Sequence, residues 1–229
     1  MLKKKYLENC AHDEYFNQYG LKHVPMLVNV DDHFNDLDYI HELIEWEINV
    51  GESNGNGQFS FKNAKIMKNV LKELGDECKC VVEIGVARNY KDSSTDILIN
   101  NKPDNCFYIG IDINCGGKTE YMNHKPNVRI VGIDSKNHEY VRGFLDGMKI
   151  EKIDLLFIDG NHSINMMIND WKYSKHVIKN GYVLIHDTNN HPGPHFIYDN
   201  IDENRFEKKK YFTYRKNDCG IAVCRKLVD

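Results

Sequence analysis

The sequence lacks the features that direct a protein into a membrane or a secretory route. No apolar run approaches the roughly 20 residues that a membrane-spanning helix needs. The first ten residues, MLKKKYLENC, lack the apolar core of a signal peptide. The seven cysteines are an odd number and cannot all pair in disulfides. We therefore expect a cytoplasmic protein with no membrane partner and with reduced cysteines.

Motifs for several classes of ligand are also absent. Cys78 and Cys80 have no second cysteine pair at zinc-finger spacing, so a structural zinc site is not expected. Ala87 and Asn89 stand where further glycines would follow Gly85 in a dinucleotide-binding G-x-G-x-x-G motif. The net charge of −4, without a basic stripe, disfavours nucleic acid as a partner. The expected ligand is therefore neither a dinucleotide nor a nucleic acid.

The composition is typical of a globular protein with one large core. The chain has 229 residues, of which 41% are hydrophobic and 28% charged. A helical spacing runs from Leu37 to Ile48, and the glycine- and asparagine-rich run from Gly51 to Gln58 interrupts it. We therefore divide the chain into an N-terminal helical arm or cap, residues 1–61, and a main domain, residues 62–229.

Apolar runs alternate with amphipathic helices in the main domain. Strands are predicted at residues 80–84, 106–111, 128–133, 153–158 and 182–185, and helices around residues 67–74, 97–99, 141–148 and 164–171. Gly75 is expected to end the first helix and Asn180-Gly181 the last. The alternation predicts right-handed βαβ crossovers and a parallel sheet with helices on both faces.

The last 20 residues depart from this alternation. Two short apolar runs, residues 211–214 and 221–224, are joined by a short turn, which predicts an antiparallel hairpin. The basic run Lys208–Lys210 before them is interpreted as a solvated loop.

Acidic residues follow several of the predicted strands. Asp112, Asp134 and Asp159 each close one strand, and the carboxyl ends of parallel strands form the ligand crevice of an open α/β sheet. Asp112, beside the Gly85 turn, is placed to accept the hydroxyls of a ribose, and Asp134 with Ser135 to reach the adenine of the same ligand. Turn formation or helix capping is the alternative role for each acid.

Three hydroxyl residues, Ser93, Ser94 and Thr95, begin the helix that follows the Gly85 turn. Their hydroxyls and the amides at the start of the helix can hold a carboxylate of the ligand. Capping of the helix is an equally natural use.

Asp159, His186 and Asp187 form a candidate site for a divalent metal. Magnesium prefers oxygen ligands, whereas the nitrogen of His186 suits manganese, iron or zinc better. Strict alternation along a strand points His186 and Asp187 to opposite sides, which leaves one of them structural. Asn189 is a substitute oxygen ligand.

His162, three residues after Asp159, is a candidate general base, because histidine takes up a proton near neutral pH. The alternative is a structural histidine at the start of a helix, with Asp170 as its hydrogen-bonding partner. The run from His191 to His195, HPGPH, predicts a rigid loop at the mouth of the crevice with structural histidines.

Five segments of the sequence resemble the class I S-adenosylmethionine-dependent methyltransferases. They are VVEIGVARNYKDSST, YIGIDIN, VGIDS, LLFIDGNHS and GYVLIHDTNN. Within that family they are most similar to the small-molecule O-methyltransferase branch, which includes the macrocin-type sugar methyltransferases and the cephalosporin hydroxylase-like proteins. The match covers residues 62 to about 225, its most specific part is the pair FIDGNHS and GYVLIHDT, and the first 60 residues are unmatched.

The resemblance implies a Rossmann-like three-layer αβα sandwich, with a seven-stranded, mostly parallel sheet that ends in an antiparallel C-terminal hairpin. It also implies a set of cofactor contacts: Glu83 and Gly85 at the first turn, Asp112 on the ribose, Asp134 and Ser135 near the adenine, and Asp159 near the methionine end. Many relatives bind a divalent metal through acids that match Asp159 and Asp187. This sequence departs from the family at Asn89, where glycine is common, and at Thr188, where catechol-type enzymes have asparagine.

We therefore expect methyl transfer from S-adenosylmethionine to a hydroxyl of a small molecule or sugar. His162 and Asp159 are the expected catalytic residues, and Asp159, His186 and Asp187 the expected ligands of Mg²⁺ or another divalent metal. The absence of the Asn/Asp-Pro-Pro-Tyr/Phe motif, which grips a flipped base, disfavours methylation of nucleic acid.

Two alternatives stay open at this point. One is a metal-dependent hydrolase or hydroxylase that uses the same crevice. The other is a catalytically silent nucleoside-binding module, suggested by Asn89 and Thr188. The sequence specifies neither the methyl acceptor nor the oligomeric state, and it leaves room for a homo-oligomer.

Overall fold

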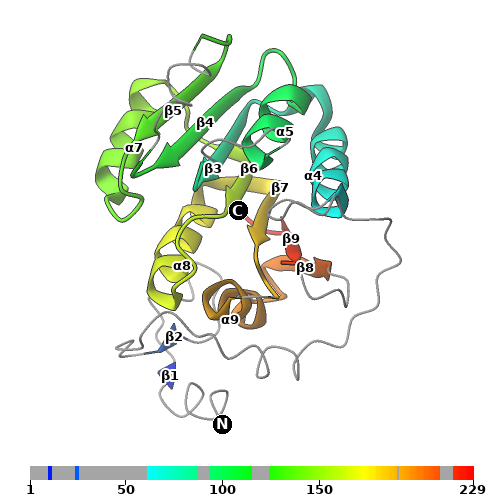
Figure 1. The fold of residues 1–229 in the computed structure, drawn as a ribbon, viewed down its shortest axis with the longest axis vertical. Coiled ribbons are helices and arrows are strands. Elements are labelled where there is room, and N and C mark those ends of the chain that lie inside the picture. The colour runs from blue at the N-terminus through cyan, green and yellow to red at the C-terminus, as the bar shows by residue number, and fades with distance from the viewer. Residues whose placement is uncertain are drawn as a thin grey trace.

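The computed structural model describes residues 10–11, 24–25, 61–86, 93–114, 124–189, 191–211 and 219–229. Its main feature is a seven-stranded sheet (Figure 1). The strands are β3 (Cys80–Ile84), β4 (Phe107–Asp112), β5 (Val128–Gly132), β6 (Ile153–Ile158), β7 (Val177–His186), β8 (Phe206–Tyr211) and β9 (Ile221–Lys226). Their order across the sheet is β5-β4-β3-β6-β7-β9-β8.

The direction of the strands agrees with the pattern in the sequence. The strands from β5 to β7 pair in parallel, as the interposed helices require, and β9 pairs antiparallel with both β7 and β8. The predicted mostly parallel sheet with an antiparallel C-terminal hairpin is confirmed.

Helices cover both faces of this sheet. They are α4 (Phe61–Leu74), α5 (Ser94–Asn101), α7 (His138–Gly147), α8 (Ile164–Trp171) and α9 (Pro192–Asn200), with 3₁₀ turns η1 (Gly75–Glu77) and η2 (Lys172–His176). Successive strand residues enter different cores, since Val81 and Leu155 pack with residues of α4 and α5, whereas Val82 and Leu156 pack with residues of α7, α8 and α9. The described domain is therefore a three-layer αβα sandwich (Figure 1).

Two helix boundaries depend on left-handed backbone positions. Gly75, with φ of +59°, follows the last residue of α4, as predicted. The prediction that Asn180-Gly181 ends a helix was wrong: α8 ends at Trp171, and Asn180, with φ of +65°, lies within β7. There, residues 178–181 bulge opposite Asp154 alone, because the pairing of β6 with β7 shifts register.

The hairpin also differs in its bounds from the prediction. Its first strand, β8, begins at Phe206, and residues 212–214 of the predicted strand lie outside the described residues. Lys210 is therefore not part of a solvated loop. Its side chain is buried, donates to His195 Nδ1 at 2.9 Å and lies 4.5 Å from the centre of the Tyr198 ring. Burial lowers the pKa of Lys210 to about 8.

Most of the predicted N-terminal arm or cap lies outside the described residues. The parts described before α4 are β1 (Cys10–Ala11) and β2 (Val24–Pro25), which pair antiparallel. The helix predicted over Leu37–Ile48 falls outside them, so the division of the chain at residue 61 stays a prediction. Among the described helices, none is long and apolar enough to cross a membrane.

Candidate active site

The carboxyl ends of β3, β4 and β6 are joined closely at the Gly85 turn. Gly85 N donates to Ile111 O at 2.9 Å, and Asp159 N donates to Ile84 O at 2.8 Å. Gly85 has φ of +90°, and a Cβ atom there would lie 2.0 Å from Asp159 O. Only glycine fits this position, so the turn holds the ends of β3 and β6 together.

Glu83 lies under this turn and is fully buried. Its carboxylate accepts hydrogen bonds from Ser94 Oγ at 2.6 Å and Thr95 Oγ1 at 2.9 Å. The Tyr108 hydroxyl donates a further one. Burial raises the pKa of Glu83 to about 7, although these hydrogen bonds oppose the shift. Glu83 thus joins β3, β4 and α5.

Of the two uses that the sequence left open for the hydroxyl residues at the start of α5, the structure shows helix capping. Ser93 caps the helix in a capping box with Asp96. Ser94 and Thr95 hold a carboxylate, and that carboxylate belongs to Glu83. The contact of these three residues with a cofactor stays a prediction.

Asp112 lies at the end of β4, beside the Gly85 turn. Its Oδ2 accepts from Val86 N at 3.0 Å, and its Oδ1 accepts from Asn114 N at 2.7 Å. The partly exposed carboxylate is therefore fixed in orientation by the backbone on both sides.

Asp134 and Ser135 follow β5 on the α7 side. Asp134 is exposed, and its Oδ1 accepts a hydrogen bond from Lys136 N at 2.9 Å. This contact forms a turn, which was the alternative role considered for this acid. Ser135 is buried, and its carbonyl accepts from the Tyr173 hydroxyl at 2.6 Å. The structure thus fixes the backbone here, and contact with an adenine stays a prediction.

The ends of β6 and β7 bring Asp159, His186 and Asp187 together. His186 Nδ1 lies 3.0 Å from Asp159 Oδ1 and 3.2 Å from Asp187 Oδ1. The three residues each offer one ligand atom, and these atoms lie within 4.8 Å of one another. Burial raises the pKa of Asp159, but the charge of His186 and the contacts of both neighbouring histidines outweigh it and lower the value to about 2.

The expectation that His186 and Asp187 point to opposite sides was wrong. The strand ends at His186, and Asp187 has φ of +57°, a left-handed conformation that is uncommon outside glycine. This change of backbone turns the carboxylate back toward His186. Strained positions of this kind cluster at functional sites.

His162 lies close to the same two carboxylates. Its Nε2 is 3.1 Å from Asp187 Oδ2 and 3.5 Å from Asp159 Oδ1. These two acids, rather than the predicted Asp170, are its neighbours. Asp170 is instead buried in α8, where it accepts from Asn169 at 3.2 Å and where burial raises its pKa to about 6.

His191 was predicted to lie in a rigid loop, but residues 192–200 form the helix α9 directly after it. Pro192 and Pro194 fit the first turn of a helix, where the amides have no intrahelical acceptor. The His191 ring stacks on the His162 ring, with 4.4 Å between centres, and its Nε2 lies 3.9 Å from Asp187 Oδ2. His191 is thus part of the cluster.

Asn63 is a further neighbour that the sequence did not indicate. It lies in the first turn of α4, and its Nδ2 is 3.1 Å from His186 Nε2. The two residues are 123 positions apart. No local pattern connects them, so only the tertiary fold reveals this contact.

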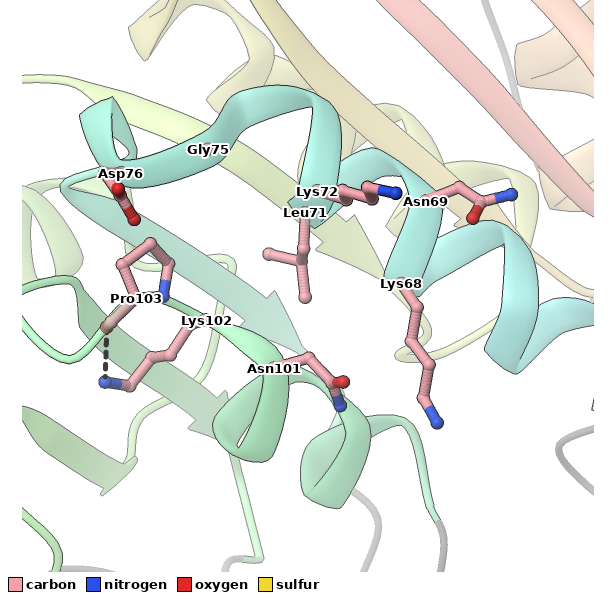
Figure 2. A pocket seen from close by; sticks show the side chains of 9 residues that line it. All are labelled: Lys68, Asn69, Leu71, Lys72, Gly75, Asp76, Asn101, Lys102 and Pro103. Atoms are coloured by element: carbon pink, nitrogen blue, oxygen red, sulfur yellow. Dashed lines mark hydrogen bonds between the residues drawn. The ribbon is translucent and has the colours of Figure 1, made fainter.

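A groove of about 500 Å³ lies at the other end of the strands (Figure 2). Its lining residues are Lys68, Asn69, Leu71, Lys72, Gly75, Asp76, Asn101, Lys102 and Pro103. They precede the amino ends of β3 and β4 in the chain, so the groove is at the opposite edge of the sheet from the histidine and aspartate cluster.

Comparison with known sequences gives a partial match to a viral protein. No protein-family model matches the chain. The uncharacterized protein R132 of Acanthamoeba polyphaga mimivirus is 31% identical over 133 residues, which cover 53% of this chain and 57% of that protein. The chain thus spans little more than half the length of this relative.

Comparison with solved structures identifies the fold. The O-methyltransferase from Bacillus cereus, in complex with SAH, has a TM-score of 0.56 at 15% identity and covers 99% of this chain and 100% of its own. The class I methyltransferase fold is shared by this chain. MycE from the mycinamycin biosynthetic pathway, in complex with Mg and SAH, has a TM-score of 0.52 at 14% identity. The structural alignment covers 74% of this chain and 51% of the MycE chain.

An rRNA methylase from Streptococcus thermophilus has the same architecture, with a TM-score of 0.51 at 12% identity, covering 73% of this chain and 95% of its own. The resemblance and the Rossmann-like fold predicted from the sequence are confirmed at the level of fold. The methylases with this fold differ in substrate, so the reaction must be argued from the site.

Proposed function

We propose that this chain transfers a methyl group from S-adenosylmethionine to a hydroxyl oxygen of a small molecule or sugar. The observation that carries the proposal is the cluster of His162 with Asp159 and Asp187, beside the Gly85 turn of a methyltransferase fold. The SAH found in the Bacillus cereus enzyme and in MycE supports the same choice of cofactor.

The residues at the strand ends fit a nucleoside cofactor. The crevice at the carboxyl ends of β3 and β4 is where a ribose binds in open α/β sheets, and Asp112 lies there with a carboxylate held by two backbone amides. Gly85 leaves space where any side chain would meet Asp159. Asp112 is the proposed ribose ligand, and Asp134 with Ser135 the proposed wall beside the adenine.

Asp159, His186 and Asp187 fit a divalent cation. Their ligand atoms converge within 4.8 Å, and Asp187 Oδ1 is a buried oxygen without a hydrogen-bond partner among the described residues. A bound cation would supply a lowered pKa and a fixed orientation for the acceptor hydroxyl. Mg²⁺ is the ion named for MycE, and His186 adds a nitrogen ligand that suits Mn²⁺ also.

His162 is the proposed general base. Its side chain is partly exposed, and Nε2 lies between two carboxylates, which stabilise the imidazolium formed when it takes a proton. In the transfer, the acceptor oxygen forms a bond to the methyl carbon as the bond from that carbon to sulfur breaks, and the hydroxyl proton passes to His162. S-adenosylmethionine supplies the activated methyl group, so the residues mainly align oxygen and carbon.

A transfer assay tests this proposal. The chain is incubated with methyl-labelled S-adenosylmethionine, Mg²⁺ or Mn²⁺ and a panel of sugars and phenols, and labelled ether and S-adenosylhomocysteine are measured. We expect acceptor-dependent product that decreases on chelation and returns with added metal. Activity that survives exhaustive chelation would mean that His162 acts without a metal, and cofactor binding without transfer to any acceptor would contradict the proposed reaction.

A further inference from the structure

A second set of metal-ligand atoms adjoins the proposed catalytic group. His162, Asp187 and His191 each offer one such atom, and these atoms also lie within 4.8 Å of one another. The set shares Asp187 with the first one. It differs in chemistry, because two of its three ligands are imidazoles.

We propose that His162, Asp187 and His191 form a binding site for a divalent transition metal of zinc-like preference. The binding itself does not depend on the proposed function. Its consequence for catalysis does, because it concerns the same His162.

The distances suit a small metal ion. Asp187 Oδ2 lies 3.1 Å from His162 Nε2 and 3.9 Å from His191 Nε2. Zinc binds nitrogen and oxygen at about 2.0–2.2 Å, so the ligand atoms of a tetrahedral site are roughly 3.3 Å apart. The first distance is close to that value, and the half-exposed His191 side chain would have to turn toward Asp187 to shorten the second.

The contacts within the set are not those of hydrogen bonds. His162 Nε2 is a buried nitrogen without a hydrogen-bond partner among the described residues, although it lies so close to a carboxylate oxygen. The two atoms approach each other without the direction that a hydrogen bond needs. A buried nitrogen beside a carboxylate oxygen, with no hydrogen bond between them, leaves both atoms able to bind a metal ion.

The backbone holds the three residues in place without a metal. His191 N donates to Asp187 O at 3.2 Å, which folds the segment after β7 back over Asp187. Gly193 N donates to His162 O at 3.1 Å, and this joins the start of α9 to the start of α8. The His162 and His191 rings are stacked within 24° of parallel. The set is therefore pre-organised by the packing of α9 on α8.

The ligand set selects the kind of metal. Two histidines and one carboxylate, with a further position open, are typical of catalytic zinc sites and of several iron sites. Mg²⁺ prefers oxygen ligands and fits the first set better, since two of its three ligands are carboxylates. The first set is therefore expected to prefer Mg²⁺, and the second set a zinc-like metal.

Occupation of the second set would affect methyl transfer. A metal bound to His162 Nε2 would place positive charge on the imidazole and lower its affinity for the proton of the acceptor hydroxyl. Zinc at this site is therefore expected to inhibit the reaction that Mg²⁺ supports.

Cobalt binding tests the site directly. Untagged protein without cofactor is titrated with Co²⁺, whose tetrahedral nitrogen and oxygen complexes absorb visible light far more strongly than the hydrated ion. We expect a strong visible band in the wild type. His191→Phe keeps an aromatic ring against His162 but lacks the ligand nitrogen, and it should weaken cobalt binding roughly tenfold or more.

Asp159→Asn is the matched control, because Asp159 belongs to the first set alone. It should keep the cobalt band. Loss of the band in Asp159→Asn with retention in His191→Phe would place the metal in the first set and overturn the proposal. A weak spectrum of the octahedral type in the wild type would overturn it as well.

Zinc inhibition tests the consequence. In the Mg²⁺-supported transfer assay, the zinc concentration that halves the rate of each variant, relative to its own uninhibited rate, should rise roughly tenfold or more in His191→Phe. Equal inhibition of both proteins would contradict the inference. If no transfer is detected with any acceptor, the proposed function fails, while the cobalt titration still decides the metal site.

Discussion

Glu83 gives the clearest prediction at the scale of single residues. Burial raises its pKa to about 7, against an ordinary value of 4.5. The folded protein then keeps a proton that the unfolded chain loses, so the free energy of unfolding should decrease as the pH rises from about 4.5 to 7. The full effect is on the order of 3 kcal/mol. Asp170 contributes with the same sign, because its pKa is raised to about 6.

Glu83→Gln should remove most of this pH dependence while it keeps the size of the side chain. Urea unfolding of the wild type and the variant at about pH 5 and pH 7 measures it. Glu139→Gln, at an exposed position of α7, is the control. It should leave the change in the free energy of unfolding between the two pH values the same as in the wild type. If the free energy of unfolding of the wild type instead rose from about pH 5 to pH 7, by the same amount as in Glu83→Gln, the raised pKa of Glu83 would be contradicted.

His162 carries the prediction on turnover. His162→Gln removes the base but keeps a polar side chain between Asp159 and Asp187. We expect kcat to fall by roughly 10² to 10⁴ and the affinity for S-adenosylmethionine to stay within about twofold. His138→Gln, at a half-buried histidine of α7, is the control. A turnover equal to that of the wild type would exclude His162 as the base.

Some roles of single residues could be predicted from the sequence and others could not. The acids at Asp112, Asp159 and Asp187 follow apolar runs, so their place at one edge of a parallel sheet is a local property of the chain. The partner of Ser94 and Thr95 is not local, because it depends on α5 packing against β3. The direction of the Asp187 side chain depends on a positive φ that no sequence pattern showed.

At the scale of elements, the site depends on how closely α9 approaches α8. A Cβ atom on Gly193 would lie 2.3 Å from His162 O and 2.7 Å from Ser163 O. Gly193→Ala should therefore displace the start of α9, lower the free energy of unfolding by about 1–3 kcal/mol and weaken cobalt binding. Thermal unfolding and the cobalt titration measure the two effects.

Gly143→Ala is a matched control for this prediction. Gly143 lies within α7, and a Cβ atom there would meet nothing within 4 Å. Alanine should stabilise this helix by about 0.5–1 kcal/mol. If Gly193→Ala kept the stability and the cobalt binding of the wild type, as Gly143→Ala should, the close packing of α9 on α8 would not be what holds the site.

The elements that the sequence placed correctly are those with strong periodicity. The strands β3 and β6 have the predicted bounds, and α8 begins at the predicted Ile164 but ends earlier than predicted. The sequence misplaced elements where proline or asparagine has two uses. Pro192 and Pro194 are compatible with a loop and with the first turn of a helix, and Asn180 is compatible with a helix end and with a strand bulge. Tertiary packing decided each case.

At the scale of the whole molecule, the strand order explains why distant residues meet. β6 lies between β3 and β7, so the Gly85 turn, Asp159 and Asp187 follow one another along a single edge of the sheet. The order reverses between β3 and β6, which is where open α/β sheets bind ligands. The resemblance to methyltransferases predicted a seven-stranded sheet and a common cofactor for these residues, but it did not include the strand order. Periodicity alone predicts that the strands are parallel but gives no order.

The central claim is that this edge of the sheet binds S-adenosylmethionine. Calorimetric titration of the wild-type chain with S-adenosylmethionine tests it most directly, with Asp112→Asn as the site variant and Asp104→Asn, in an exposed turn, as its control. We predict saturable binding of one cofactor per chain, weakened roughly tenfold or more in Asp112→Asn through loss of the ribose contact and unchanged in Asp104→Asn. No heat of binding at millimolar cofactor would contradict the proposed function.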